Sequence, residues 1–500
     1  METGPGAPTP PIAIAGGAAD AVARPGPARV EVDDAVLARL RDVCADVTDD
    51  PAVVGEASRD WWPLAMTWAL EGQLPGRAAV VARPSSPAEV ARVLSVCHDA
   101  TVPVTAAAGR SGVCGASVPV FGGVVLDLCG LDGIRDVDDH SLIVDVLPGT
   151  FGDRFEAELQ RDHGLTVGHW PQSMTLSTVG GWIACRGAGQ FSTRYGKIED
   201  IVVGLDVALA NGRTLSTGGH PRQATGPDLT QLFVGSEGTL GIITGARLAA
   251  HPTPTHERRG AWALPSFAEG LDVSRRILRR GATPAVLRLY DGIESDRTYH
   301  VGTERNVLLV LDEGDPAVVD GMWQVVEQEC ASAERLDDEL VEHWMQKRND
   351  VAALEQLIAG GLVVDTMEVS GRWSALPPVY HAALGAISGV SGTLAVSAHC
   401  SHSYTDGACL YFTFAGKPDP DAKDAFYRDV WDAGTRAVLA NGGSLSHHHG
   451  VGMNRSRFMA EALGGGLDVL AAVKTALDPR GILNPGKLGL DSPWGTPSVP

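Results

Sequence analysis

The first third of the chain alternates short apolar runs with amphipathic stretches. Residues 78–82 form a continuous apolar run, which is typical of a buried strand. Residues 86–89 read Ser-Pro-Ala-Glu, a capping box with proline at the first helical position, and apolar side chains then recur at helical spacing as far as Cys97. Another short strand is expected over residues 102–105. Together these elements predict a β-α-β unit.

Further elements are expected on both sides of this unit. A helix over residues 33–47 precedes it. After it we expect strands over 124–128, 142–146 and 201–209, a helix through Phe155 and Leu159, a hairpin turn at Asn211-Gly212 and a short helix over 228–234. The segment that begins at Gly235 leads into one more strand.

Beyond residue 254 the glycines become fewer. We expect strands over 287–290, 307–311, 395–398 and 410–414, and helices over 266–280, 315–333, 372–388 and about 422–440. This half therefore predicts a second domain of the α+β class. A helix over 466–477 closes the chain.

The composition fits a globular protein of two or more domains. The chain has 500 residues, and a hydrophobic fraction of 44% is normal for a protein that buries a large core. The formal net charge of −21 excludes the basic footprint of a nucleic-acid-binding protein and general attraction to anionic membranes. A local basic pocket for an anionic substrate stays open. Without a run of 18 apolar residues, no membrane-spanning helix is expected, and membrane contact would be peripheral at most.

Cysteine usage and the chain ends bear on the compartment. The eight cysteines are scattered without a Cys-x-x-Cys pair, which predicts neither a zinc motif nor a disulfide framework and fits a reducing, cytoplasmic compartment. Residues 1–29 are rich in proline, glycine and alanine, lack the order of a signal peptide and are expected to be a disordered tail. The last residues, 498–500, do not form a Ser-Lys-Leu address, and 491–500 is expected to be a second tail.

Two stretches of small residues follow predicted strands. Residues 106–115 can offer successive backbone N–H groups to a phosphate, although a structural turn is an equal alternative. The stretch ends without Gly-Lys-Ser/Thr and leads into a strand, so neither Walker A nor a Rossmann fingerprint fits. A second small-residue region over 177–189 is hard to explain by packing.

The segment from Ser444 to Gly452 contains three successive histidines, His447, His448 and His449, between small residues. Three interpretations stay open: an exposed polar turn, a metal site built on His-x-His, or a proton-transfer site. If the segment is extended, alternation places His447 and His449 on one side and His448 on the other. No complementary Cys, Asp or Glu motif supports a metal, so none is predicted.

These loops, with Ser236–Gly241 and the closing Asn484–Lys487, resemble the flavoprotein family of vanillyl-alcohol oxidase and D-lactate dehydrogenase type over about residues 75 to 490. The resemblance implies an α+β fold in which a two-subdomain FAD-binding domain (PCMH type) carries a cap domain and a C-terminal helical segment. The expected parts are an N-terminal helical region over 30–74, the FAD-binding domain over 75–255, the cap or substrate domain over 256–440 and an active-site segment over 441–490. FAD is expected to be non-covalent, because no histidine lies in either phosphate loop.

Within that family, residues 440–452 and Tyr404–Phe412 resemble alkyldihydroxyacetonephosphate synthases. The resemblance implies a transferase without net redox change. It exchanges the acyl group of an acyl-dihydroxyacetone phosphate for a fatty alcohol through a flavin N5 adduct, and the carboxylate departs before the alcohol adds. It also implies a phosphate- or carboxylate-bearing small-molecule substrate and a homodimer. An FAD oxidase or dehydrogenase of a hydroxy acid or alcohol is the alternative, and a metal-binding or non-catalytic protein is a third.

The resemblance assigns roles to individual residues. Tyr411 would transfer the proton, with His447, His448, His449 and His169 near the reacting carbon, and Arg348 would bind the phosphate with support from Arg288. The expected FAD contacts are Thr105, Ala106, Ala107, Ala108, Gly109, Arg110, Ser111, Gly112, Pro171, Gln172, Ser173, Thr178, Gly181, Cys185, Arg186, Gly187, Ala188, Glu237, Gly238, Thr239, Leu240, Gly241, Ile242 and Ile243.

Several points in these assignments stay open. A tyrosine acts as a base only if nearby cations lower its pKa, which clustered imidazoles and an arginine could do. Without the resemblance, Tyr411 could be a core residue, Arg348 a surface residue and Glu237 a turn cap. The loop Ala106–Arg110 has fewer glycines than the family pattern, and Gln172 replaces a frequent aspartate. The Ala-, Gly- and Arg-rich composition suggests a high-GC bacterium, where the scaffold could serve secondary metabolism.

Overall fold

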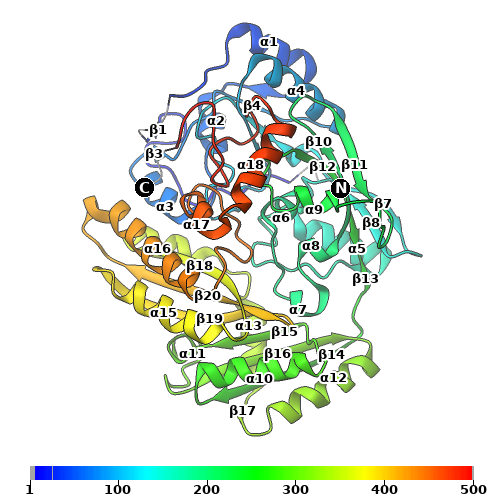
Figure 1. The fold of residues 1–500 in the computed structure, drawn as a ribbon, viewed down its shortest axis with the longest axis vertical. Coiled ribbons are helices and arrows are strands. Elements are labelled where there is room, and N and C mark those ends of the chain that lie inside the picture. Colours follow the sequence, from blue (N-terminus) through cyan, green and yellow to red (C-terminus); the bar gives the residue numbers. More distant parts are fainter. Residues whose placement is uncertain (1–5, 25, 27, 498–500) are drawn as a thin grey trace.

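The computed structural model describes residues 6–24, 26 and 28–497. The amino-terminal part of the chain and the carboxy-terminal helices form one half of the molecule, and the segment between them forms the other half (Figure 1). Within the described residues, no helix is both long enough and apolar enough to cross a bilayer. All eight cysteines are free thiols.

The first half contains a four-stranded sheet, a five-stranded sheet and two two-stranded pairs, β1 with β3 and β9 with β13. In the four-stranded sheet, β2, β4, β6 and β5 lie in that order, and β4 and β5 both run parallel to β6, which gives the expected β-α-β unit. In the five-stranded sheet the order is β11, β10, β12, β8, β7. The elements up to this point are β1 (Val22–Ala23), α1 (Asp34–Val43), β2 (Val47–Thr48), α2 (Pro51–Ala57), α3 (Pro63–Ala69), β3 (Gln73–Leu74), β4 (Val80–Ala82), α4 (Pro87–Ala100), β5 (Val104–Ala107), β6 (Val124–Asp127), the 3-10 helix η1 (Leu128–Gly130), β7 (Ile134–Asp138), β8 (Ile143–Val146), α5 (Gly152–His163), β9 (Leu165–Thr166), α6 (Val179–Cys185), α7 (Ser192–Tyr195), α8 (Ile198–Ile201), β10 (Val202–Ala208), β11 (Thr214–Gly218), α9 (Leu229–Phe233), β12 (Ile242–Ala249) and β13 (His251–Pro252).

The second half is built on a seven-stranded antiparallel sheet in the order β17, β14, β16, β15, β19, β20, β18. Helices α10, α12, α15 and α16 lie along it (Figure 1). Its elements are β14 (His256–Leu264), α10 (Phe267–Arg279), β15 (Val286–Tyr290), α11 (Gly292–Tyr299), β16 (Asn306–Gly314), α12 (Pro316–Glu329), β17 (Glu334–Leu336), α13 (Glu339–Lys347), α14 (Ala352–Ala359), β18 (Val363–Arg372), α15 (Leu376–Ser388), β19 (Thr393–Ser403), β20 (Gly407–Gly416), η2 (Pro420–Ala422) and α16 (Lys423–Ala440). The sheet thus begins at His256 and its last helix ends at Ala440.

The chain then returns to the first half. The elements after α16 are η3 (Ser456–Phe458), α17 (Met459–Leu463) and α18 (Gly466–Leu477), and α18 is drawn in red in Figure 1. The buried Lys474 of α18 donates to the carbonyl oxygens of Thr239 and Leu483 and pairs with Asp478 at 2.6 Å. These contacts fix the returning segment against the loop that precedes β12.

The prediction of a disordered tail over residues 1–29 is wrong where the structure describes that segment. Ile12, Ile14 and Ala21 are buried in a cluster with Trp61 and Leu74. β1 pairs in parallel with β3. The prediction overlooked the few apolar residues in a segment whose composition is otherwise typical of tails. The start, 1–5, and the end, 498–500, lie outside the described residues, whereas Trp494 of the second expected tail packs on Phe121.

Three smaller expectations also change. Ser86 accepts from the N–H of Glu89, but the Glu89 carboxylate reaches the N–H of Ser85 rather than that of Ser86, so the capping box is shifted by one residue. The strand expected over 102–105 runs over Val104–Ala107, into the small-residue loop. The helix expected over 372–388 begins at Leu376, because Arg372 ends β18, a strand that the sequence pattern did not reveal, and residues 373–375 form a turn.

Candidate active site

A cavity of about 650 Å³ lies between the two halves of the molecule. This volume is within the ~300–1,000 Å³ typical of ligand sites. Small-residue loops of the first half line one part of it, and the cap sheet with its connections lines the other. The two histidines His448 and His449 of the returning segment complete the wall.

Most of the residues expected to hold FAD line this cavity. They are Ala106, Ala107, Ala108, Gly109, Arg110, Ser111, Gly112, Pro171, Gln172, Ser173, Thr178, Gly181, Cys185, Gly187, Ala188, Glu237, Gly238, Gly241, Ile242 and Ile243. The four others do not line it: Thr105 and Leu240 are buried, the exposed Arg186 pairs with Glu199, and the Thr239 hydroxyl donates to the carbonyl of Ser236. The loops of the first half therefore converge on one site.

Close backbone packing explains the glycine in the first loop. A Cβ atom at Gly109 would lie 2.2 Å from the carbonyl oxygen of Leu176, so a side chain there would separate the loop from its neighbour. Arg110, which follows it, pairs with the buried Asp127 at 2.6 Å at the end of β6. These contacts join the two small-residue regions into one continuous wall.

Unpaired polar atoms in the cavity wall fit a polar cofactor. Both ring nitrogens of the fully buried His169 have no partner within the described residues, and the ring packs on Trp182 with centroids 4.6 Å apart. Burial, and then the positive charge of Lys197, lowers the pKa of His169 to about 3, so the imidazole is neutral. A buried polar atom without a partner is costly, which favours a ligand that supplies one. The residues present therefore fit a flavin dinucleotide.

Glu237 links the loop before β12 to the histidine segment. Its carboxylate accepts from the backbone N–H groups of Val451 at 2.5 Å and Gly452 at 2.9 Å. The amide of Asn484 donates to the backbone carbonyl of Glu237 at 2.6 Å. Glu237 is therefore a junction between three distant segments rather than only a turn cap.

A second buried carboxylate, Glu368 on β18, shapes the histidine segment. Its Oε1 accepts from the successive backbone N–H groups of His447, His448 and His449 at 3.2, 3.1 and 2.8 Å. Both carboxylate oxygens also accept from the buried guanidinium of Arg455. Burial opposes ionisation, but Arg455 and then His449 hold the pKa of Glu368 well below its usual range, so the carboxylate is charged.

The expected alternation of the three histidines is therefore wrong. Residues 447–449 form bends instead of a strand, because one carboxylate oxygen gathers three successive N–H groups on the same side. His448 and His449 line the cavity, with ring centroids 4.4 Å apart. His447 does not line it but lies behind His448, and the Nδ1 atoms of these two rings are 2.9 Å apart.

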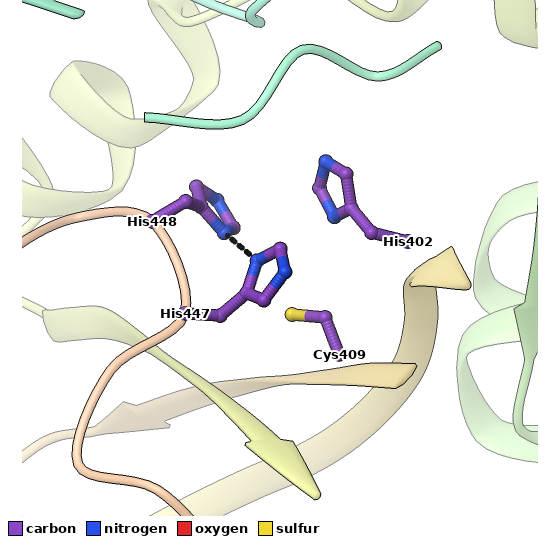
Figure 2. Close-up of side chains that lie close together, drawn as sticks. All are labelled: His402, Cys409, His447 and His448. Carbon is purple, nitrogen blue, oxygen red and sulfur yellow. Dashed lines mark hydrogen bonds between the residues drawn. The ribbon is translucent and has the colours of Figure 1, made fainter. Parts of the chain in front are cut away.

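Two further groups from the cap sheet meet these rings. Figure 2 shows His402 of β19 and Cys409 of β20 beside His447 and His448. One potential ligand atom from each of the four residues lies within 4.8 Å of the others. Burial, and then His447, lowers the pKa of His402 well below its usual value, and burial raises the pKa of the Cys409 thiol, so both groups are neutral.

Tyr411 on β20 faces this cluster from the floor of the cavity. It stands in register with Glu368 on one side and His399 on the other, and its ring stacks on His399 with centroids 4.8 Å apart. Its hydroxyl donates to Thr366 Oγ1 at 3.1 Å, and it lines the cavity rather than the core. The expectation that imidazoles lower its pKa is not met: burial raises the pKa of the phenol, and Arg288 is the cation that opposes this rise.

The two predicted arginines lie in the cavity wall. Arg288 donates to the hydroxyl of Tyr290 at 2.6 Å, and its Nη2 lies 2.6 Å from His399 Nε2. Arg348, which directly follows α13, donates to Gln190 at 3.0 Å and lies over Phe191 with 5.0 Å between guanidinium and ring centroid. Within the described residues Arg348 forms no ion pair with a carboxylate, which leaves its charge available to an anion.

Sequence reasoning missed several residues of this site. Glu368 and Arg455 carry no local signal, because their pairing joins β18 to a loop 87 residues later in the sequence. His399 was within reach, since it stands in the strand that precedes Tyr411. His402 was not, because alternation puts residues three apart on opposite faces of a strand, and the register shift between Cys400 and His402 gives no local signal. Lys197, whose ammonium donates to the carbonyl of His447 at 2.8 Å, gave no signal.

Comparison with known proteins agrees with this arrangement. Residues 78–218 match the model of an FAD binding domain, and residues 253–488 match that of FAD linked oxidases, C-terminal domain. An FAD-linked oxidoreductase of Escherichia coli, YgcU, is 32% identical over 83% of this chain and 89% of its own length. The alkyldihydroxyacetonephosphate synthase of Dictyostelium discoideum is 28% identical over 83% of this chain and 74% of its own. A solved structure of an alkyldihydroxyacetonephosphate synthase has the same fold, with a TM-score of 0.78 over 96% of this chain and 89% of that one, at 24% identity.

Proposed function

Because the chain belongs to the family of FAD-linked oxidases and uses FAD, we propose that it is an alkylglycerone-phosphate-synthase-like transferase. In this proposal it exchanges the acyl group of an acyl-dihydroxyacetone-phosphate-type ester for an alkyl alcohol. The observation that carries the proposal is one cavity lined by His448, His449, Tyr411 and Arg348. The similarity to an alkyldihydroxyacetonephosphate synthase supports the same proposed function.

In this proposal Arg348 binds the substrate phosphate and Arg288 supports the site. Arg348 is held by Gln190 and by aromatic rings, and its guanidinium keeps donors for a phosphate oxygen. A guanidinium binds phosphate with two parallel hydrogen bonds, which orients the ligand as well as holding it. Arg288, fixed by Tyr290, stands next to Tyr411 and His399 and stabilises negative charge that develops near them.

Proton transfer falls to Tyr411 and the neutral imidazoles. The phenol keeps its proton in the free site, because burial raises its pKa, so it is suited to donate. Burial, followed by the charge of His449, lowers the pKa of His448, so that imidazole is neutral and suited to accept. When bound, FAD supplies an electron-poor ring system next to these groups.

A product assay tests this assignment. The flavin-containing protein is incubated with an acyl-dihydroxyacetone phosphate and a radiolabelled long-chain alcohol, and lipid products are separated. We expect label in an alkali-stable ether that retains the phosphate. A protein that contains flavin and forms no ether would rule out this substrate class.

Arg348→Met is expected to raise KM for the phosphate-bearing ester by about 10–100-fold, because it removes charge-assisted hydrogen bonds worth about 1.5–3 kcal/mol. Steady-state kinetics at several ester concentrations check this. Arg279→Met, on the exposed side of α10, is the matched control and should leave KM unchanged. An Arg348→Met variant with wild-type KM would show that the phosphate binds elsewhere.

FAD is expected to be held without a covalent bond. No histidine stands in either small-residue region, 106–115 or 177–189. Acid precipitation should therefore release all of the flavin into the supernatant, measured by absorbance. Flavin that stays with the pellet would contradict this and would direct attention to His169 or Cys185, which also lines the cavity.

A second function has its own support. The relative that is 32% identical is named an oxidoreductase, and oxidation of a hydroxy acid would use the same arginines for a carboxylate. Anaerobic addition of short 2-hydroxy acids and alcohols tests it by the flavin absorbance. Bleaching that oxygen or an acceptor dye reverses would favour an oxidase or dehydrogenase over the transferase.

A further inference from the structure

His448 is the first member of a chain of hydrogen bonds that leads away from the cavity. Its Nδ1 lies 2.9 Å from Nδ1 of His447, and Nε2 of His447 lies 3.0 Å from the hydroxyl of Tyr404. That hydroxyl in turn lies 3.1 Å from Oγ of Ser192. His447, Tyr404 and Ser192 are buried or nearly so, and none of the three lines the cavity.

The chain of hydrogen bonds joins three parts of the fold. Ser192 begins α7 in the first half, and Tyr404 follows β19 in the cap. The two histidines, which Figure 2 draws, belong to the returning segment. The backbone N–H groups of both histidines are held by Glu368, and Lys197 holds the carbonyl of His447. The two rings are therefore fixed at both the backbone and the side chain.

The number of donors and acceptors on each ring restricts the tautomers of the two hydrogen-bonded histidines. A neutral imidazole has one donor and one acceptor nitrogen, so an Nδ1–Nδ1 contact needs the proton on one ring only. If His448 donates from Nδ1, His447 accepts there and carries its own proton on Nε2, which it donates to Tyr404. Tyr404 then donates to Ser192, and Nε2 of His448 has its lone pair free. The opposite polarity would place a proton on that Nε2.

We propose that His447, Tyr404 and Ser192 are positioning residues that hold His448 in the tautomer whose Nε2 is a base toward the cavity. This inference rests on the proposed function, in which a proton must leave the substrate. In the step, an N–H bond forms at Nε2 as the substrate C–H bond breaks, and its electron pair stays on the substrate. The added proton makes the two imidazoles jointly cationic, with Tyr404 accepting from the far end, until the proton returns to the substrate. No other reactant is consumed.

The four side chains in Figure 2 could be taken for a metal site; they are His402, Cys409, His447 and His448. Their contacts favour hydrogen bonding instead. Both ring nitrogens of His447 are engaged, one by His448 and the other by Tyr404. The ammonium of Lys197 lies against the carbonyl of His447, and this positive charge opposes a second cation beside it. A bound metal is therefore the competing outcome of the test.

The test reads tautomers in the intact flavin-containing protein, without substrate. In two-bond ¹H–¹⁵N spectra of ¹⁵N-histidine-labelled protein, with His447→Gln and His448→Gln for assignment, we expect Nδ1–H at His448 and Nε2–H at His447. Tyr404→Phe should change the signals of both rings, because it removes the acceptor at His447. Tyr380→Phe, in a half-buried cap position away from the cavity, is the matched control and should change neither.

The tautomer of His448 and the formation of ether are measured separately, so either can fail without the other. Signals of His448 that stay unchanged in Tyr404→Phe, or a proton on its Nε2 at rest, would overturn the inference. So would one equivalent of zinc that the protein retains after dialysis against zinc and that Cys409→Ser loses. With the ester and alcohol, Tyr404→Phe should lower kcat by about 10–100-fold at unchanged KM. If Tyr404→Phe changes the signals of both histidines but the protein makes no ether, the proposed roles of His447, Tyr404 and Ser192 are supported and the transferase function is rejected.

Discussion

Tyr411→Phe is expected to lower turnover by about 10²–10⁴-fold while the protein keeps its flavin, which is the usual effect of losing a positioned proton-transfer group. The variant removes one oxygen, whose hydrogen-bond partner is the cap residue Thr366. The aromatic ring stays stacked on His399, so the cavity keeps its shape. Turnover with ester and labelled alcohol, together with the flavin-to-protein absorbance ratio, measures both parts of the prediction.

The control for this variant is Tyr380→Phe, which also removes a phenol oxygen from the cap, where Tyr380 contacts Asp291 at 3.3 Å. It should retain full turnover. If Tyr411→Phe instead works at the wild-type rate, the phenol takes no part in the chemistry, and the proton must be handled by the imidazoles alone.

Glu368→Gln is expected to destabilise the folded protein by about 3–5 kcal/mol, because Arg455 would stay buried without its charge partner. Both side chains are fully buried, so solvent screening does not reduce this cost. Glutamine keeps an oxygen that can accept from the three histidine N–H groups, which isolates the effect of the charge. The melting temperature of the flavin-containing protein, compared with that of the exposed-site control Glu355→Gln, checks the prediction.

A double variant separates stability from positioning. Glu368→Gln with Arg455→Met leaves no unpaired buried charge, so most of the lost stability should return. Turnover should stay low, since the charged oxygen that gathers the histidine N–H groups is still absent. A double variant that is both stable and fully active would show that the carboxylate does not organise the site.

The fold was largely readable from the sequence where local patterns act. Periodicity located α4, β10 and α18 to within a few residues, because these elements are amphipathic or continuously apolar. It missed β18, whose place depends on pairing with β20 and not on its own pattern. The first residues were misread as a tail because average composition hides the two isoleucines that are buried against Trp61.

The site residues that belong to recognisable sequence motifs could be predicted. The loops of the first half, Tyr411 and both arginines were assigned through the resemblance, and all reach the same cavity. The conformation of the histidine segment was not predictable, because Glu368, far away in the sequence, replaces the extended backbone by bends. For the same reason the sequence could not tell that His447 lies behind His448.

The most direct test of the transferase mixes the flavin-containing protein, without oxygen or alcohol, with an acyl-dihydroxyacetone phosphate labelled in the acyl chain. We expect free fatty acid to appear in a rapid burst equal to the flavin concentration and then to stop, because the acyl group leaves before the alcohol enters. Addition of a long-chain alcohol should restart the release and form the ether. The absence of a burst from flavin-saturated protein would show that the protein does not release the acyl group ahead of alcohol addition.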